Sequence, residues 1–530
     1  MRKIFTFAVV LGFLAGLIAL PAAAQTPDWY GHGHRVSLSG DILARILSGG
    51  ATSSNISNQG FVCPAESSAT GNVQVNCLAE DGNSPQNTQS ETSVSASGNK
   101  VVVGFNDSLV CCIPAINLTG YSVSTDGGKT FTDMGDLPFR SSVQPLGDPA
   151  VAHDAAGNFY FASLAISSTG IGSHSLVSFY EMPAGSSTFQ LVSVPVDVGD
   201  SRKFFADKEY LAVATDGNGN THFYITWTFF SAVVASPIML TESTDGVNWR
   251  TTMVSASDAC ATFSNPVPVP NTNIVHVSWE QLVPSGCTNP NVTAANEMMA
   301  TADVGSGTVL RRTTIAPING SGDKIVACNS AADLREVIET APGHDVRLLE
   351  GPNTSVDGNG VLYAVWNDRP GGVGGSFSNA TRIFLSFSLD GNQTWSTPQA
   401  ISGRPSSKNM NDRFQPWIAV DTGLHAMWYE RVAGSSVDVI QTDKEDLSLA
   451  SAKSAPRTIN AESAISSVTF PVVQTNPNQD PIIANCYMGD YNNITSNGSL
   501  RFVTWGDNRN VVTTSTGVTE NQPDVFLQSY

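Results

Sequence analysis

From residue 91 onward, polar and apolar positions follow a pattern that recurs along the chain. Each copy starts with a polar or acidic residue, often followed by Pro, and continues into a short apolar strand. A turn with Gly or Asn follows, and a second strand then ends in an aromatic residue. The copies are Glu91–Phe105, Asp148–Phe161, Asp207–Trp227, Asn265–Trp279, Gly351–Trp366, Gln415–Trp428 and Gly489–Trp505.

The spacing of these copies predicts the fold. Their starts lie about 55 to 90 residues apart, which suits the blades of a β-propeller with some long loops. Two strands alone cannot bury their faces, so radial stacking of the units is the natural solution. We therefore expect an all-β chain, a β-propeller of four-stranded antiparallel blades. Seven blades are favoured and six are the alternative.

The N-terminal residues bear on location. A basic head, Met1-Arg2-Lys3, precedes the apolar run from Ile4 to Leu20, and small residues stand before Gln25. This pattern predicts a signal peptide over residues 1–24 and a secreted protein, extracellular or periplasmic, with an uncleaved anchor helix as the alternative. Residues 25–85 are rich in Ser, Asn and Gly and match no blade, so we interpret them as a linker that can also close the ring. The propeller itself is assigned to residues 86–530.

Composition narrows the partners. The net charge of −19 argues against nucleic acid and against anionic membrane surfaces. The eight cysteines of an exported chain are expected to pair. Cys63 with Cys77 and Cys260 with Cys287 close the shortest loops, whereas Cys111, Cys112, Cys328 and Cys486 cannot be assigned. We interpret His32-x-His34 as coil and predict no transition-metal site.

Three copies are followed by a sharper motif. It spans Ser124–Phe131, Ser243–Trp249 and Ser388–Trp395, each with Asp-Gly or a similar turn before an aromatic residue. The motif resembles the Asp box, or BNR repeat, of sialidases and related propellers. That resemblance implies a position on the hairpin between the third and fourth strands of a blade, away from the ligand face. Asp126, Asp245 and Asp390 are therefore interpreted as structural, with each carboxylate accepting N–H groups of its own turn.

Carboxylates and arginines gather at the ends of strands that share one face of a propeller. Glu91, Asp148, Asp207, Glu350, Asp412 and Asp490 stand before inner strands. Glu280, Asp368, Arg369, Glu430, Arg431, Asp507 and Arg509 follow the strand-ending aromatics. Propellers bind ligands at such a face, so these residues are candidates for a site. Their recurrence in several units also fits a purely architectural role.

The resemblance to sialidases implies roles for some of these residues. A retaining sialidase clamps a carboxylate with three arginines, attacks with a Tyr paired to a Glu, and uses an Asp as acid and base. In this chain Arg369, Arg413 and Arg509 would form the clamp, with Asp368 and Asp507 beside them as substrate-binding residues. Tyr491 would be the nucleophile, Glu350 or Glu430 its base, and Asp148 the acid. The Phe-Arg-Ile-Pro motif of the family is absent, and Phe139-Arg140 is the nearest string.

These features support two functional hypotheses. One is a secreted glycoside hydrolase, exo-acting and of sialidase or related type, on extracellular glycans or glycoproteins. The other is a non-catalytic propeller that binds a glycan or a protein. We expect a monomer with no cofactor, and the abundance of oxygen ligands leaves a structural calcium ion open.

Overall fold

The computed structural model covers most of the propeller region. It describes residues 27–30, 62–65, 71–81, 86–109, 116–167, 172–233, 235–284, 294–328, 334–341, 344–373, 380–403, 411–432, 439–472, 480, 483, 485–513, 517 and 519–530. The helix α2 (Leu78–Asp81) is far too short to cross a membrane, and no other helix in these ranges could do so. The predicted signal peptide and His32-x-His34 lie outside the described residues.

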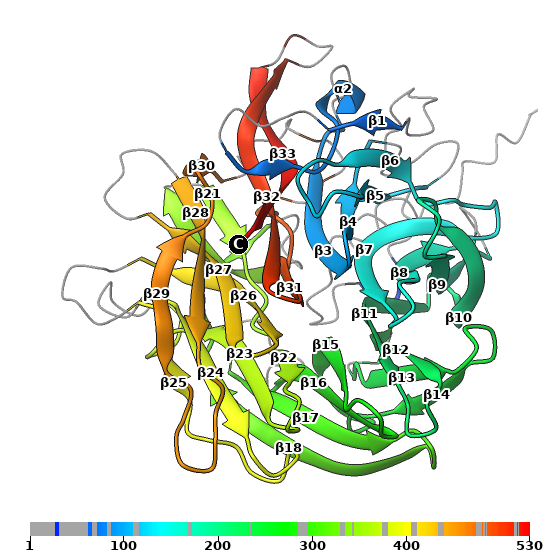
Figure 1. The fold of residues 1–530 in the computed structure, drawn as a ribbon, viewed down its shortest axis with the longest axis vertical. Coiled ribbons are helices and arrows are strands. Elements are labelled where there is room, and N and C mark those ends of the chain that lie inside the picture. The colour runs from blue at the N-terminus through cyan, green and yellow to red at the C-terminus, as the bar shows by residue number, and fades with distance from the viewer. Residues whose placement is uncertain are drawn as a thin grey trace, which may run out of the picture.

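The chain folds as a β-propeller, which confirms the predicted fold class (Figure 1). In the sheets of the ring, consecutive strands run in chain order from the centre outward, antiparallel to their neighbours, and N-terminal strands add to the outer edges of the first and last sheets. The first sheet contains β3 (Gln89–Ser97), β4 (Lys100–Asp107), β5 (Thr119–Ser124) and β6 (Thr132–Asp136). The second contains β7 (Gln144–His153), β8 (Phe159–Ile166), β9 (His174–Met182) and β10 (Gln190–Asp200). The third contains β11 (Phe204–Thr215), β12 (Thr221–Ser231), β13 (Ile238–Ser243) and β14 (Arg250–Met253).

Four more sheets complete the ring in the same order. The fourth sheet contains β15 (Ala261–Pro268), β16 (Ile274–Leu282), β17 (Ala295–Asp303) and β18 (Thr308–Ile318), and the fifth contains β22 (Asn353–Val356), β23 (Leu362–Asp368), β24 (Arg382–Ser388) and β25 (Gln399–Ala400). The sixth contains β26 (Arg413–Val420), β27 (Leu424–Arg431), β28 (Val439–Leu447) and β29 (Thr458–Ala464), and β30 (Phe470–Pro471) also pairs with β28. The last contains β31 (Asn493–Asn497), β32 (Leu500–Thr513), β33 (Thr519–Ser529) and β2 (Val73–Gln74).

The innermost strands form a closed cycle. Strands β3, β7, β11, β15, β22, β26 and β31 each contact the next, and β31 contacts β3 (Figure 1). A ring of seven inner strands is the arrangement that the seven-blade prediction requires.

The aromatic residues that end the second strands form the core between sheets. Trp279, Trp428 and Trp505 are fully buried, each packed against residues of the preceding sheet such as Tyr224, Tyr363 and Tyr429. Burial of a large aromatic side chain contributes a few kcal/mol, so these residues hold neighbouring sheets together.

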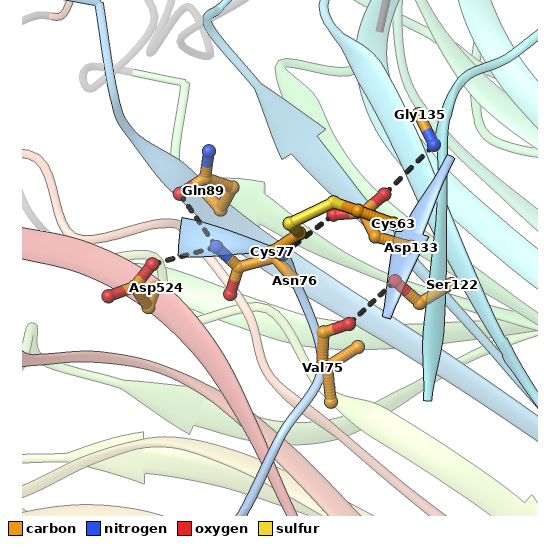
Figure 2. Close-up of a disulfide and its surroundings, with 9 residues drawn as sticks. All are labelled: Cys63, Val75, Asn76, Cys77, Gln89, Ser122, Asp133, Gly135 and Asp524. Carbon is orange, nitrogen blue, oxygen red and sulfur yellow. Dashed lines mark hydrogen bonds between the residues drawn. A yellow bond between two sulfur atoms is a disulfide. The ribbon is translucent and has the colours of Figure 1, made fainter. Parts of the chain in front are cut away.

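The N-terminal segment joins the first sheet to the last (Figure 2). β2 pairs with β33 of the last sheet, while β1 (Cys63–Pro64) pairs with β6 of the first. Asn76 Nδ2 donates to Asp524 at 2.7 Å and to Gln89 at 3.3 Å, so one side chain contacts both sheets. The predicted disulfide Cys63–Cys77 is present beside these contacts.

The Asp-box motifs lie on the hairpins β5–β6, β13–β14 and β24–β25. Asp126 Oδ1 accepts the backbone N–H groups of Lys129 and Thr130, both at 3.0 Å. Partial burial would raise the pKa of Asp126. These backbone bonds, together with those from Thr130 Oγ1 and Ser124, outweigh it and lower the pKa to about 2. The carboxylate serves its own turn, as the structural interpretation expects.

An additional three-stranded sheet follows the fourth sheet of the ring along the chain and lies beside β28 in the structure (Figure 1). It consists of β19 (Lys324–Ala327), β20 (Leu334–Ala341) and β21 (His344–Arg347). The disulfide Cys328–Cys486, which the sequence left unassigned, ties this sheet to the segment before β31. Cys260 is also disulfide-bonded, and its predicted partner Cys287 lies outside the described residues, as do Cys111 and Cys112.

Candidate functional site

Five inner strands begin with a bulge in which a residue other than Gly has a positive φ. These residues are Glu91, Asp148, Lys208, Phe263 and Gln415, with φ between 51° and 57°. Each falls in a register shift that interrupts the pairing of its strand with the second strand. Such conformations cost free energy and persist only where surrounding contacts hold them.

Lys208 supplies these contacts at the centre of the ring. Its Nζ lies 3.3 Å from Glu91, 3.4 Å from Asp148 and 2.8 Å from Asp490. All four side chains are buried. The lysine therefore links the first, second, third and last sheets through charge.

Arg347 of the additional sheet also reaches this cluster. Arg347 of β21 donates to both carboxylate oxygens of Asp490, at 2.8 and 2.7 Å, and its guanidinium lies 4.7 Å from the ring centre of Tyr487. Burial alone would raise the pKa of Asp490, but the charges of Arg347 and Lys208 outweigh it and hold the pKa below its ordinary value. For Glu91, burial prevails over Lys208 and raises the pKa to about 8.

The predicted nucleophile, Tyr491, lies beside this cluster. Its ring centre is 5.3 Å from Lys208 Nζ, and its hydroxyl donates to the carbonyl of Pro149 at 3.2 Å. Burial, together with the nearby carboxyls of Glu91 and Asp148, raises the pKa of Tyr491 well above its ordinary value. A phenol held in its neutral form is a poor nucleophile, so the structure argues against the predicted role. The carboxyls that act on it are also not the predicted bases, Glu350 and Glu430.

Asp148, the predicted acid, belongs to the same buried cluster. Its carboxylate is fully buried beside Lys208, and its backbone N–H donates to Asn106 Oδ1 at 2.8 Å. A carboxyl enclosed in this way has no access to a substrate in the structure. Its observed role is to hold the lysine.

The contacts of the three predicted clamp arginines fall into separate groups. Arg369 pairs with Asp323, and Arg509 pairs with Asp507 at 2.5 Å. Arg413 pairs with Glu430 at 3.0 Å and with Glu462. Each guanidinium is paired with different carboxylates of the protein. In the described part of the chain, the three arginines therefore do not form a common binding site for a substrate carboxylate.

Glu430, predicted as a base, belongs to a carboxyl cluster with Asp443 and Glu462, whose oxygens lie close enough together to suit a metal ion. Hydrogen-bond donors already surround this cluster. Arg413 donates to Glu430 and Glu462, and the amide of Gln441 donates to both Glu430 and Asp443. Burial and the adjacent Glu430 raise the pKa of Asp443 to about 10. Arg413 and Gln441 therefore already bind oxygens of this cluster, and the structural calcium ion stays a prediction.

A second cluster of carboxyl side chains lies where the fourth and fifth sheets meet. Glu280 of β16 is paired in register with Glu297 of β17, and both are buried. Burial, followed by the charges of Glu280, Glu350 and Asp368, raises the pKa of Glu297 well above its ordinary value. Neither carboxyl oxygen of Glu297 has a hydrogen-bond partner among the described residues. Two predicted site residues, Glu350 and Asp368, are thus brought together.

Asp368 has the properties of a proton donor. Its Oδ1 accepts the backbone N–H groups of Arg369 at 2.8 Å and of Asn319 at 3.2 Å, which fixes the carboxyl group. Burial raises its pKa to about 7, with Glu350 adding to the rise and the two backbone bonds opposing it. In contrast to the buried acids of the central cluster, Asp368 is partly exposed. It is a fixed, accessible carboxyl group that holds its proton near neutral pH.

Comparisons with known proteins find only distant likenesses among solved structures. No protein-family model matches the sequence, and no curated protein matches it. A Penicillium chrysogenum α-L-arabinanase is 11% identical, with a TM-score of 0.44, 68% of this chain covered and 92% of that chain. The GH93 α-L-arabinofuranosidase of Fusarium graminearum is 13% identical, with a TM-score of 0.40 and the same coverage. Trypanosoma rangeli sialidase is 10% identical, with a TM-score of 0.38, 67% of this chain covered and 54% of that chain. At such distances the activity has to be argued from the residues of this chain.

Several residues of these clusters escaped the sequence analysis. Lys208 occupies the bulge position that Glu91 and Asp148 occupy in their own strands. The repeat pattern places Asp207, one residue earlier, at that position. Aligning the copies on the first regularly paired residue would have found it. Arg347 and Glu297 stand in segments without a repeat motif, and no sequence signal marks them.

Proposed function

We propose that the protein is a glycoside hydrolase in which Asp368 is the proton donor and Glu350 is the buried neighbour that helps to raise its pKa. The observation that carries the proposal is the state of Asp368, which is fixed by two backbone N–H groups, partly exposed, and has a pKa raised to about 7. Glycosidases use two carboxyl groups in different protonation states, one to protonate the leaving group and one to assist at the anomeric carbon.

The reaction follows from these roles. Asp368 transfers its proton to the glycosidic oxygen as the bond to the anomeric carbon breaks. Water adds to that carbon and releases a proton, which completes the hydrolysis, while the buried Glu350 acts through Asp368, whose pKa it helps to raise. The buried neighbour Glu297 retains its own proton, which limits the negative charge around Glu350 and Asp368.

The substrate is proposed to be a neutral glycoside rather than a sialoside. A sialic acid carries a carboxylate that needs free guanidinium groups, and Arg369, Arg413 and Arg509 are each paired with carboxylates. The net charge of −19 also disfavours an anionic ligand. The protein is proposed to remove terminal sugars from extracellular glycans or glycoproteins.

We also propose that the protein belongs to the sialidase-like BNR propellers and is exported. The three Asp-box turns support membership of the sialidase-like BNR propellers, because each carboxylate binds its own turn. The disulfides Cys63–Cys77 and Cys328–Cys486 support an oxidising, extracellular or periplasmic location. The monomeric state stays a prediction.

A non-catalytic binding propeller is the second candidate. The observation that favours it is the buried ion-pair cluster of Lys208, Asp490 and Arg347, which fills the centre of the ring where the inner strands begin. In this alternative, Asp368 contributes a hydrogen bond to a bound glycan and transfers no proton.

Hydrolysis of fluorogenic aryl glycosides of several neutral sugars and of sialic acid tests the proposal. We expect turnover of a neutral glycoside, lowered about 100- to 10,000-fold by Asp368→Asn. Asp390→Asn is the matched control, because that carboxylate serves an Asp-box turn, and its rate should match the wild type. Binding without turnover by folded wild-type protein would favour the second candidate instead.

A further inference from the structure

The end of the channel opposite Asp368 contains a cavity of about 340 Å³. Residues of all seven inner strands line it. Asn265, Trp417 and Asn493 at its deep end are buried, whereas Val213, Val356 and Thr495 are partly exposed. The cavity therefore widens toward solvent where the inner strands end, and its volume falls in the range of small-molecule sites.

Aromatic rings close the deep end. Tyr210 and Trp417 lie 4.9 Å apart between ring centres, and Tyr491 lies 6.4 and 6.1 Å from them. The hydroxyl of Tyr210 accepts a hydrogen bond from Asn493 at 2.6 Å. Tyr491 also contacts Lys208, so this floor separates the cavity from the charged centre.

The lining is polar but uncharged. It contains no Asp, Glu, Lys or Arg, and its polar groups are amides, hydroxyls and His153. His153 Nδ1 lies 2.8 Å from Ser95 Oγ. No residue in the described part of the chain hydrogen-bonds the other ring nitrogen of His153 or the indole N–H of Trp417. These groups are available to a ligand.

We propose that this cavity binds a neutral sugar, either a free monosaccharide or the terminal residue of a neutral glycan. Aromatic rings beside amide and hydroxyl groups suit a ligand with an apolar C–H face and several hydroxyls. The closed floor admits one end of a chain and does not let it pass through. The uncharged lining disfavours anionic sugars, because a carboxylate would lose its hydration without gaining a cationic partner.

Ligand-detected NMR on the full chain tests this site. The probes are methyl glycosides of galactose, glucose, mannose and arabinose, neutral oligosaccharides ending in the same sugars, and N-acetylneuraminic acid. We expect saturation transfer to at least one neutral sugar and none to N-acetylneuraminic acid. A signal from a methyl glycoside without one from the oligosaccharides assigns the site to single sugars, and a signal from the oligosaccharides assigns it to glycan ends.

Variants locate the binding. Thr495→Trp narrows the mouth and should remove the signal of this cavity, leaving only that of the proposed catalytic site, and Trp417→Ala should weaken the affinity of the cavity at least about tenfold. Thr458→Trp, on the exposed outermost strand β29, is the matched control and should bind normally. Asp368→Asn should also bind normally, which separates this site from the proposed catalytic one. Absence of binding to every neutral probe, or a signal that Thr495→Trp leaves unchanged in folded protein, would overturn the proposal.

Discussion

At the scale of single residues, Asp368 differs from the other carboxyl groups near the channel in combining a raised pKa with access to solvent. Because a general acid works only in its protonated form, loss of its proton should lower kcat/KM as pH rises. With a pKa of about 7, we expect the alkaline limb of the pH profile near pH 7 on a neutral aryl glycoside. Asp390→Asn should keep this limb, since Asp390 lies on a distant Asp-box turn. A flat profile between pH 6 and 9 would exclude the role.

Tyr491 gives a second prediction at this scale. Its hydroxyl donates to the carbonyl of Pro149 and is held neutral, so Tyr491→Phe removes one buried hydrogen bond and no reacting atom. We expect kcat to change less than about threefold and stability to fall by about 1 kcal/mol, measured by denaturant unfolding. Loss of turnover in folded Tyr491→Phe would restore the nucleophile that the resemblance to sialidases suggested.

The candidate residues show how far sequence reasoning reaches. The repeat places Glu350 and Asp368 at strand ends of one face, and the structure does bring them together. The same reasoning grouped Arg369, Arg413 and Arg509, yet their partners Asp323 and Glu462 lie in segments without a repeat motif. Which carboxylate neutralises a given guanidinium depends on tertiary contacts, and strand position does not encode them.

At the scale of elements, the disulfide Cys328–Cys486 and the pair Arg347–Asp490 hold the additional sheet β19–β21 against the segment before β31. Replacing both cysteines with Ala removes the tether but leaves the ion pair. We expect a loss of about 2 to 4 kcal/mol in unfolding free energy, by denaturant unfolding. Limited proteolysis should then cleave first within residues 319–347.

The double variant Cys63→Ala/Cys77→Ala is the control. It removes the disulfide of the N-terminal segment and leaves Cys328–Cys486 intact. Its first cleavage should lie in the N-terminal segment instead. Equal resistance of residues 319–347 in both variants would show that the sheet does not depend on its tether.

The repeat predicted most elements of the ring because each blade has the same alternation and the same terminal aromatic. It did not predict the sheet β19–β21, since the 86 residues between the starts of the fourth and fifth copies were interpreted as a long loop. The strands of that sheet are short and carry no Asp box. Their pairing is visible only once Cys328 and Arg347 are seen to reach the segment before β31.

At the scale of the whole molecule, buried carboxyls with raised pKa values set the dependence of stability on pH. Burial raises the pKa of Glu91 to about 8 and that of Asp107 to about 6. Because the folded state then binds more protons than the unfolded state, unfolding free energy should fall as pH rises from about 5 to 9. The loss should be on the order of a few kcal/mol, at about 1.4 kcal/mol per unit of pKa shift.

Thermal unfolding at a series of pH values checks this sign. Hydrogen bonds hold the pKa of Asp126 and Asp390 at about 2 although burial opposes them, so stability should also fall as pH drops from about 4 to 2. The Tm should therefore be highest near pH 5. Glu91→Gln should flatten the alkaline decline, and a Tm that rises steadily from pH 5 to 9 would contradict the assignment of protonated buried acids.

The central claim is that Asp368 gives its proton to the leaving group of a neutral glycoside. Its most direct test compares wild type and Asp368→Asn on two glycosides of the same sugar, one with a dinitrophenyl leaving group and one with a methylumbelliferyl group. A dinitrophenolate departs without protonation, so the variant should retain most of its kcat on that substrate and lose at least about 100-fold on the other. Equal losses on both substrates, or no turnover of either by the folded wild-type protein, would contradict the account.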